Sequence, residues 1–220
     1  MRIEVVSDVV CPWCFVGKRR LEQALAIVRG GAPGGAADVH VAWKPYELNP
    51  DLPREGVDRA AYRRAKFGGL ERSQMLDARL LAAGESVGIS FAFDKIQRTP
   101  NTFDAHRLLW LADSLGRQDA LAEALFRAYF LDGRDAGDHG VLADLAAASG
   151  IPQERAAALL AGRDGEADVR REEDRAIRSG IQGVPHFIID GTRQISGAQD
   201  PAVIAAAIRD ALGTAANAEA

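Results

Sequence analysis

The two cysteines of this 220-residue chain, Cys11 and Cys14, are separated by two residues. A β-branched run at residues 3–6 precedes them, which is typical of a strand. After them, small and apolar residues recur three and four positions apart, as in a helix that packs one face inward. These residues are Gly17, Leu21, Ala24, Leu25 and Val28. The pattern predicts that both thiols lie at a strand-to-helix junction, with Pro12 as the first helical residue.

This placement gives the two thiols different chemistry. Cys11 is expected at the N-cap, where the free N–H groups of the first turn and the helix dipole favour the thiolate over the thiol. Cys14 is expected one turn later on the same face, and in an ideal helix the two Cβ atoms are about 5–6 Å apart. A small adjustment brings them within reach of a disulfide bond. The sequence therefore predicts a redox-active dithiol.

Composition excludes several classes of function. The chain is 47% hydrophobic with a net charge of −4, and it shows no basic patch of the kind that binds nucleic acid. No apolar run approaches the roughly 18 residues of a transmembrane helix. Glu4 and Asp8 interrupt any signal-peptide core, so we expect a cytoplasmic protein without a membrane partner. Two cysteines do not supply a four-cysteine zinc site, so neither a metal nor a bound cofactor is expected.

The rest of the pattern predicts an α/β domain interrupted by helices. A strand at 39–44 follows the first helix, which indicates a right-handed parallel βαβ unit, and a glycine-rich connector at 30–35 lies between them. Helical periodicity then continues from about 58 to 179. Two strands at 185–189 and 194–195 flank a tight Asp190-Gly191 turn, and a last helix begins at Pro201. Residues 213–220 are predicted to be a frayed tail.

The motif Cys11-Pro12-Trp13-Cys14, the later Gly183-Val184-Pro185 before a hairpin, and the inserted helices resemble the DsbA-like thioredoxin-fold oxidoreductases. Residues 7–14, 101–107 and 196–199 are most similar to the cytoplasmic FrnE-like branch. The resemblance implies an α/β, thioredoxin-like fold (β-α-β … β-β-α) with a large inserted all-helical domain. Residues 1–55 and 165–220 would form the discontinuous thioredoxin-like domain, and residues 56–164 the helical insertion.

The resemblance also implies roles for the residues that match the family motifs. Cys11 would be the attacking thiol, Cys14 the resolving thiol, and Pro185 a cis-proline beside them. Val184 would then offer its backbone to an extended substrate. The candidate substrate-binding residues are Pro12, Trp13, Val184, Pro185, His186, Asn101 and His106.

The roles of several candidates stay open at this point. Trp13 is a substrate platform or a cover for the domain interface. His186 tunes Cys11, or its side chain points off the other face of its strand. His106 lines a groove or is a solvated helix residue. Asp8 assists proton transfer to Cys14 or only forms the turn.

The leading hypothesis is a thiol–disulfide oxidoreductase or isomerase that reduces, forms or reshuffles disulfides of proteins or small molecules. Glutathione or another low-molecular-weight thiol could serve as co-substrate. The alternative is a glutathione-dependent enzyme, similar to the kappa-class transferases or 2-hydroxychromene-2-carboxylate isomerases. These usually carry serine where Cys11 stands, which favours the first hypothesis. A redox-sensing interaction protein is a third interpretation. The sequence leaves open a monomer or a homodimer.

Overall fold

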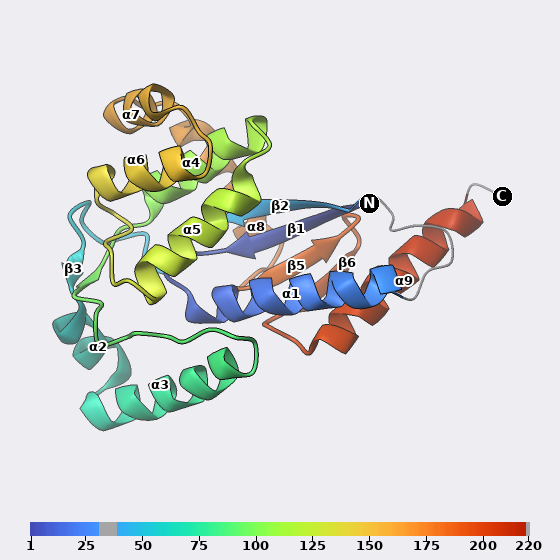
Figure 1. Cartoon of the computed structure of the whole chain (residues 1–220), viewed down its shortest axis with the longest axis horizontal. Coiled ribbons are helices and arrows are strands. Elements are labelled where there is room, and N and C mark those ends of the chain that lie inside the picture. Colours follow the sequence, from blue (N-terminus) through green and yellow to red (C-terminus); the bar gives the residue numbers. More distant parts are fainter. Residues whose placement is uncertain (31–38, 219–220) are drawn as a thin grey trace.

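The centre of the protein is a four-stranded mixed sheet (Figure 1). The computed structural model describes residues 1–30 and 39–218. The strand order is β2-β1-β5-β6, with bounds β1 Arg2–Ser7, β2 His40–Pro45, β5 His186–Ile189 and β6 Arg193–Ser196. β2 is parallel to β1, whereas β5 is antiparallel to β1 and to β6. The predicted βαβ unit and C-terminal hairpin are therefore confirmed, and the predicted connector at 30–35 lies outside the described residues beyond Gly30.

The hairpin turn has the geometry that its sequence predicts. Asp190 and Gly191 have positive φ angles of 45° and 71°. A two-residue turn of this type needs positive φ at both central positions, which Asp-Gly tolerates. The N–H of Thr192 donates to the carbonyl of Ile189 and closes the turn. The turn thereby sets the register of β6 against β5.

The two faces of the sheet carry different layers. Ile3 and Val5 pair across β1 and β5 with Ile189 and Phe187, and all four belong to the main core. That face is covered by α1 (Pro12–Gly30) and α9 (Pro201–Ala218), which pack against each other (Figure 1). On the opposite face Val6 packs with Ala176 of α8 (Glu166–Arg178) and with Ile181.

Besides α8, the helices inserted between β2 and β5 extend from the sheet at the end where α1 begins (Figure 1). They are α2 Arg59–Phe67, α3 Leu70–Glu85, α4 Phe103–Ser114, α5 Gln118–Phe130, α6 His139–Ala148 and α7 Gln153–Ala161. An aromatic cluster joins α5 to α1, because the ring of Phe15 stacks on Phe126 with centroids 5.3 Å apart. Phe130 packs on the same ring at 6.2 Å.

Two predictions about this architecture need correction. The insertion is not purely helical, because β3 (Val57–Asp58) and β4 (Arg98–Thr99) form a small antiparallel ribbon. Strands of two residues leave no alternating pattern to detect. The predicted tail at 213–220 is also wrong as far as residue 218, since α9 continues to Ala218. The alanine-rich sequence there outweighs the helix-weakening effect of Gly213. The division at residues 55/56 and 164/165 stays a prediction.

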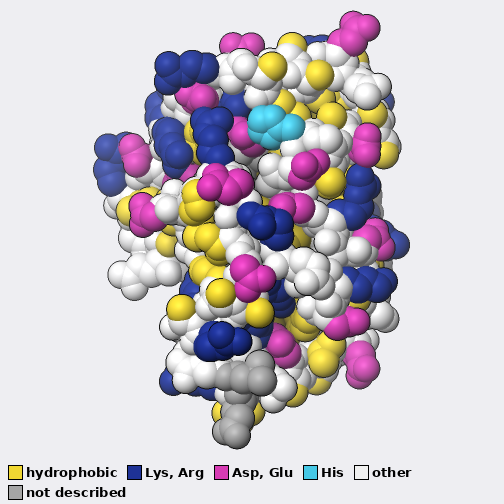
Figure 2. Space-filling model, turned by 90° about the vertical axis from the view of Figure 1, so that its left-hand side faces the viewer, with side chains coloured by type: hydrophobic (Ala, Val, Ile, Leu, Met, Phe, Trp, Pro, Cys, Tyr) yellow, Lys and Arg dark blue, Asp and Glu magenta, His cyan; other side chains and the backbone are white. Residues whose placement is uncertain are grey.

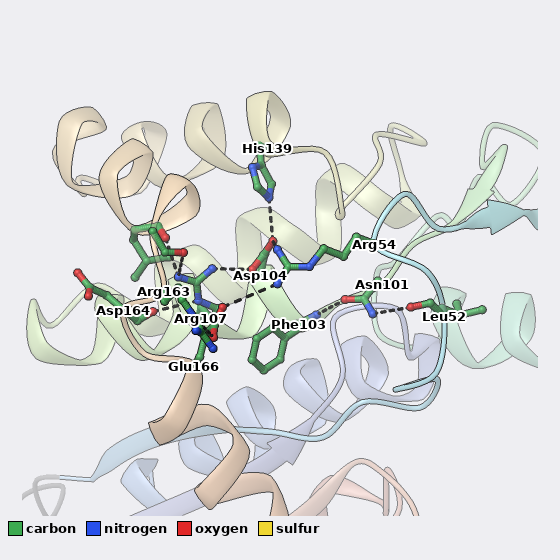
Figure 3. A network of polar contacts seen from close by, with 12 residues as sticks. Leu52, Arg54, Asn101, Phe103, Asp104, Arg107, His139, Arg163, Asp164 and Glu166 are labelled. Carbon is green, nitrogen blue, oxygen red and sulfur yellow. Dashed lines mark hydrogen bonds and ion pairs between the residues drawn. The ribbon is translucent and has the colours of Figure 1, made fainter.

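A buried arginine fixes the end of α7 and the start of α8 onto α4 (Figure 3). The Arg107 side chain is fully buried, and its guanidinium pairs with the Asp104 carboxylate at 2.8 Å. It also donates to three backbone carbonyl oxygens at 2.7–2.9 Å, those of Leu159, Gly162 and Asp164. The five N–H donors of a guanidinium form a rigid fork that can satisfy such a set of acceptors. Arg107 therefore holds the α7–α8 connection against α4.

Candidate active site

Cys11 and Cys14 lie where the chain leaves β1 and enters α1. Pro12 is the first helical residue, as predicted. The N–H of Cys11 donates to the carbonyl of Asp8 at 3.0 Å, and the N–H of Cys14 donates to the carbonyl of Cys11 at 3.0 Å. This tight turn fixes both thiols at the N-terminal end of the helix, just beyond the C-terminal end of the central strand β1.

The two thiols, both free, differ in accessibility. Cys11 retains 5% of its surface and lines a cavity, whereas Cys14 is 0% exposed. Burial raises the pKa of Cys14 well above its usual value, because the desolvated site penalises a thiolate, and the neighbouring Cys11 raises it further. Cys14 is therefore protonated at neutral pH. Only Cys11 is placed to meet a ligand.

The predicted motif before the hairpin reaches Cys11. The Cys11 thiol donates to the carbonyl oxygen of Val184 at an S···O distance of 3.6 Å, across 173 residues of sequence. The peptide bond between Val184 and Pro185 is cis. The Pro185 ring lies so close to α1 that a Cβ added at Gly17 would stand 2.8 Å from its Cγ. The structure thus brings the dithiol and this loop together.

A cavity of about 420 Å³ opens beside Cys11. Pro12 and Trp13 line it, and Trp13 is 39% exposed. Its other walls are mostly apolar and aromatic side chains from α2, α3, α5 and the segment between α3 and β4, and they include Tyr62, Phe67, Leu76, Leu80, Phe93, Tyr129 and Phe130. Figure 2 looks onto this end of the molecule and shows a band of exposed hydrophobic side chains with Lys and Arg beside it. A concave apolar site of this size suits a small organic group.

Two candidate binding residues lie elsewhere. The Asn101 amide donates to the carbonyl of Leu52 at 3.0 Å and its oxygen accepts the N–H of Phe103, the first residue of α4, at 3.0 Å (Figure 3). The His186 ring is bonded to Gln194 at 3.0 Å. Successive strand residues face opposite sides, and Phe187 contacts α1 near Gly17. His186 therefore points to the α8 face, away from the thiols.

Neither environment predicted for His106 is observed. The residue is 3% exposed, and its Nε2 lies 3.6 Å from Oδ1 of the fully buried Asp8. That separation permits charge attraction but is too long for a hydrogen bond. Burial alone would lower the pKa of His106, but the carboxylates of Asp8, Glu47 and Glu173 outweigh it and raise this pKa.

Glu47 and Glu173 extend this buried charged group, which the sequence analysis missed. The N–H of Glu47 donates to Glu173 at 2.6 Å, and Oε1 of Glu47 accepts from Arg170 at 2.6 Å. Burial and the nearby Glu173 and Asp8 raise the pKa of Glu47 to about 7, although His106 and Arg170 act against this. The members come from four distant segments, so sequence spacing offers no signal for them.

Two further properties concern ligands and membranes. Within residues 1–30 and 39–218, no group of three or more His, Cys, Asp or Glu side chains is arranged to hold a metal ion. Among the helices of the same residues, none is long and apolar enough to cross a membrane.

Comparison with known proteins identifies the family. A family model described as DSBA-like thioredoxin domain matches residues 2–209. A probable DsbA oxidoreductase of Streptomyces coelicolor is 35% identical, with a TM-score of 0.86 over 97% of this chain and 90% of that one.

Two more distant structures share the fold. The cytosolic disulfide reductase DsbM of Pseudomonas aeruginosa, solved with GSH, has a TM-score of 0.68 at 17% identity, over 96% of this chain and 99% of that one. A 2-hydroxychromene-2-carboxylate isomerase has a TM-score of 0.71 at 13% identity, over 99% of this chain and 98% of that one. The fold, the placement of the dithiol and the family match agree: this chain belongs to the DsbA-like thioredoxin domain family.

Proposed function

We propose that this protein is a thiol–disulfide oxidoreductase that works through the Cys11–Cys14 dithiol. The observation that carries the proposal is the pairing of two unlike thiols one helical turn apart. Cys11 faces a cavity and contacts the Val184 carbonyl, whereas Cys14 is fully buried with a raised pKa. A nucleophile that faces a cavity, with a protected resolving thiol behind it, is the arrangement that two-step disulfide exchange requires.

The exchange proceeds in two balanced steps. The Cys11 thiolate attacks one sulfur of a substrate disulfide, forms a mixed disulfide and releases the first substrate thiolate. Cys14 then loses its proton, attacks Sγ of Cys11 and releases the second substrate thiolate. The substrate gains two electrons, and the protein is left with a Cys11–Cys14 disulfide. The same steps in reverse oxidise a substrate dithiol or, if interrupted, reshuffle disulfides.

We further propose a cytoplasmic protein that acts as a reductase, with glutathione or another low-molecular-weight thiol as co-substrate. The fold similarity to a cytosolic disulfide reductase solved with GSH supports this assignment. In a reducing compartment the resting form of such a pair is the dithiol. The Val184 backbone beside Cys11 is the proposed site for an extended substrate segment.

The test is reduction of insulin disulfides by dithiothreitol, with and without the protein, followed by turbidity. Wild type should accelerate precipitation, and Cys11→Ser should abolish the acceleration. An equal rate with wild type and with Cys11→Ser would refute the proposal. Repeating the assay with glutathione as reductant measures its use as co-substrate.

The second candidate is a glutathione-dependent isomerase or transferase, which the fold of 2-hydroxychromene-2-carboxylate isomerase favours. Such an enzyme needs no second cysteine. Isomerisation of 2-hydroxychromene-2-carboxylate and glutathione transfer to 1-chloro-2,4-dinitrobenzene separate the candidates. Activity in either assay that survives Cys14→Ser, without insulin reduction by wild type, would support this second function.

A further inference from the structure

The cavity beside Cys11 contains more positive than negative charge. Four basic side chains line it, namely Arg59, Arg63, Lys66 and Arg79, against one carboxylate, Asp77. The chain as a whole has a net charge of −4, so this local excess does not follow from composition. An apolar cavity with such an excess attracts anions.

Within the described part of the chain, a carboxylate forms a salt bridge with one of these four cations. Arg63 pairs with Asp77 at 2.7 Å and also donates to the Ser73 hydroxyl at 2.8 Å. Lys66 donates to the neutral Asn49 side-chain oxygen at 3.0 Å and to a phenol oxygen. Among the described residues, neither Arg59 nor Arg79 forms a salt bridge. Three positive charges are therefore available to a ligand.

Arg59 is the best placed of the three. Its side chain is half-buried, its guanidinium lies 5.6 Å from the centroid of the Phe93 ring, and it lines the cavity together with Tyr129. Burial lowers the pKa of Arg59, because the surroundings stabilise its charge less than water does. A carboxylate beside it would replace the lost solvation with a charge-assisted hydrogen bond.

We propose that this cavity selects small-molecule disulfides that carry carboxylate groups, with Arg59 as the principal anion-binding residue. The cavity volume of about 420 Å³ is in the range of small-molecule sites. The apolar walls would hold the carbon skeleton while one sulfur lies at Cys11. This inference rests on the proposed disulfide exchange. Each turnover transfers two electrons from the dithiol and releases two thiols, so a single turnover of pre-reduced protein needs no other reductant.

The experiment measures single-turnover oxidation of the pre-reduced protein by three disulfides of similar length. These are 3,3′-dithiodipropionate with two negative charges, bis(2-hydroxyethyl) disulfide with none, and cystamine with two positive charges. Each rate is divided by the rate of the same disulfide with dithiothreitol, which removes differences in intrinsic reactivity. Wild type should favour the dianion over the neutral compound about tenfold at low ionic strength, and salt should reduce this ratio.

Variants assign the preference to the cavity. Arg59→Gln should reduce the dianion-to-neutral ratio about tenfold, and Arg59→Lys should retain part of it. Arg79→Gln should also reduce the ratio. Because Arg79 is exposed and its position tolerates substitution, this variant replaces Arg59→Gln as the test if Arg59→Gln does not fold. Arg64→Gln is the matched control, because Arg64 lies exposed on α2 and does not line this cavity.

The outcomes separate this inference from the proposed function. Equal normalised rates for all three disulfides would overturn the inference and leave the oxidoreductase proposal intact. If none of the three disulfides reacted faster with the protein than with an unfolded control peptide, both this inference and the oxidoreductase proposal would be overturned. If Arg59→Gln slowed insulin reduction as strongly as dianion reduction, the site would recognise charge on polypeptide substrates too. The proposal that it selects small-molecule disulfides would then be wrong.

Discussion

Gly17 lies directly against Pro185, because a Cβ at position 17 would come within 2.8 Å of the proline Cγ and 3.3 Å of the Phe187 ring. The first helix and the loop that contacts Cys11 therefore meet without space for one methyl group. The loop's contact with the dithiol depends on this close approach.

Gly17→Ala should disturb the site through this contact. The added methyl group displaces Pro185 and with it the Val184 carbonyl, while overpacking costs about 1–3 kcal/mol, more than alanine gains in helix propensity. We expect a lower melting temperature and about tenfold slower disulfide exchange. Gly30→Ala in the same helix is the control, because a Cβ there meets nothing within 4 Å. Equal exchange rates for the two variants would show that the contact is irrelevant to the reaction.

Alkylation should distinguish the two cysteines in the native protein. Because burial raises the pKa of Cys14, iodoacetamide at neutral pH should modify Cys11 first and leave Cys14 protected. Peptide mass spectrometry after short exposure to iodoacetamide measures the order in which the two cysteines are modified. Denatured protein, in which both thiols react alike, is the control. Cys14→Ser should accumulate mixed disulfides at Cys11. Simultaneous modification of both native thiols would contradict the assigned roles.

Glu47 should make the fold less stable as pH rises. Its pKa is raised from 4.5 to about 7, so between these values the folded protein keeps a proton that the unfolded chain has released. Rising pH then favours unfolding, with a total effect of at most about 3 kcal/mol and no further change well above pH 7. The raised pKa of His106 acts in the same direction, since its contribution is full below 6.5 and lost as pH passes the folded value.

Urea unfolding at several pH values measures this effect. Glu47→Gln should have a shallower decline in stability between pH 5 and pH 7 than wild type, and the exposed Glu154→Gln should match wild type. Parallel profiles for all three proteins would show that Glu47 does not titrate in this range.

Arg107→Leu should be among the most destabilising substitutions in the chain. It leaves the Asp104 carboxylate and three backbone carbonyls without their shared donor, and breaking a buried charged pair costs about 3–5 kcal/mol. Arg163→Ala is the control, since its side chain is 89% exposed and contributes about 1 kcal/mol or less through its pair with Glu166. Comparable unfolding free energies for the two variants would show that Arg107 does not stabilise the connection between α7 and α8.

Local patterns account for the parts of the fold that sequence predicts. The dithiol position follows from a β-branched run, a proline and a helical stripe, and the hairpin follows from Asp190-Gly191. Each signal lies within about 20 residues. They are reliable because backbone preferences and periodicity act at short range.

Buried polar groups account for most of what sequence could not predict. Counting apolar residues in α4 places Leu108 in the core, but it gives no reason to bury His106 or Arg107 beside it. Those two are buried because distant segments supply partners: the Asp8 carboxylate attracts His106, and backbone carbonyls at the end of α7 and just beyond it accept from Arg107. The cations around the cavity likewise come from helices whose packing the sequence does not specify.

The separation of Cys11 from Val184 has a consequence for synthesis. The two residues are 173 positions apart, and the ribosome adds about 5–20 residues per second, so the thiol precedes its carbonyl partner by about 10–35 s. Until β5 follows, β1 lacks one of its two neighbours. The nascent dithiol is therefore open to oxidation or adventitious mixed-disulfide formation during translation, and its chemistry becomes selective only when the chain is nearly complete.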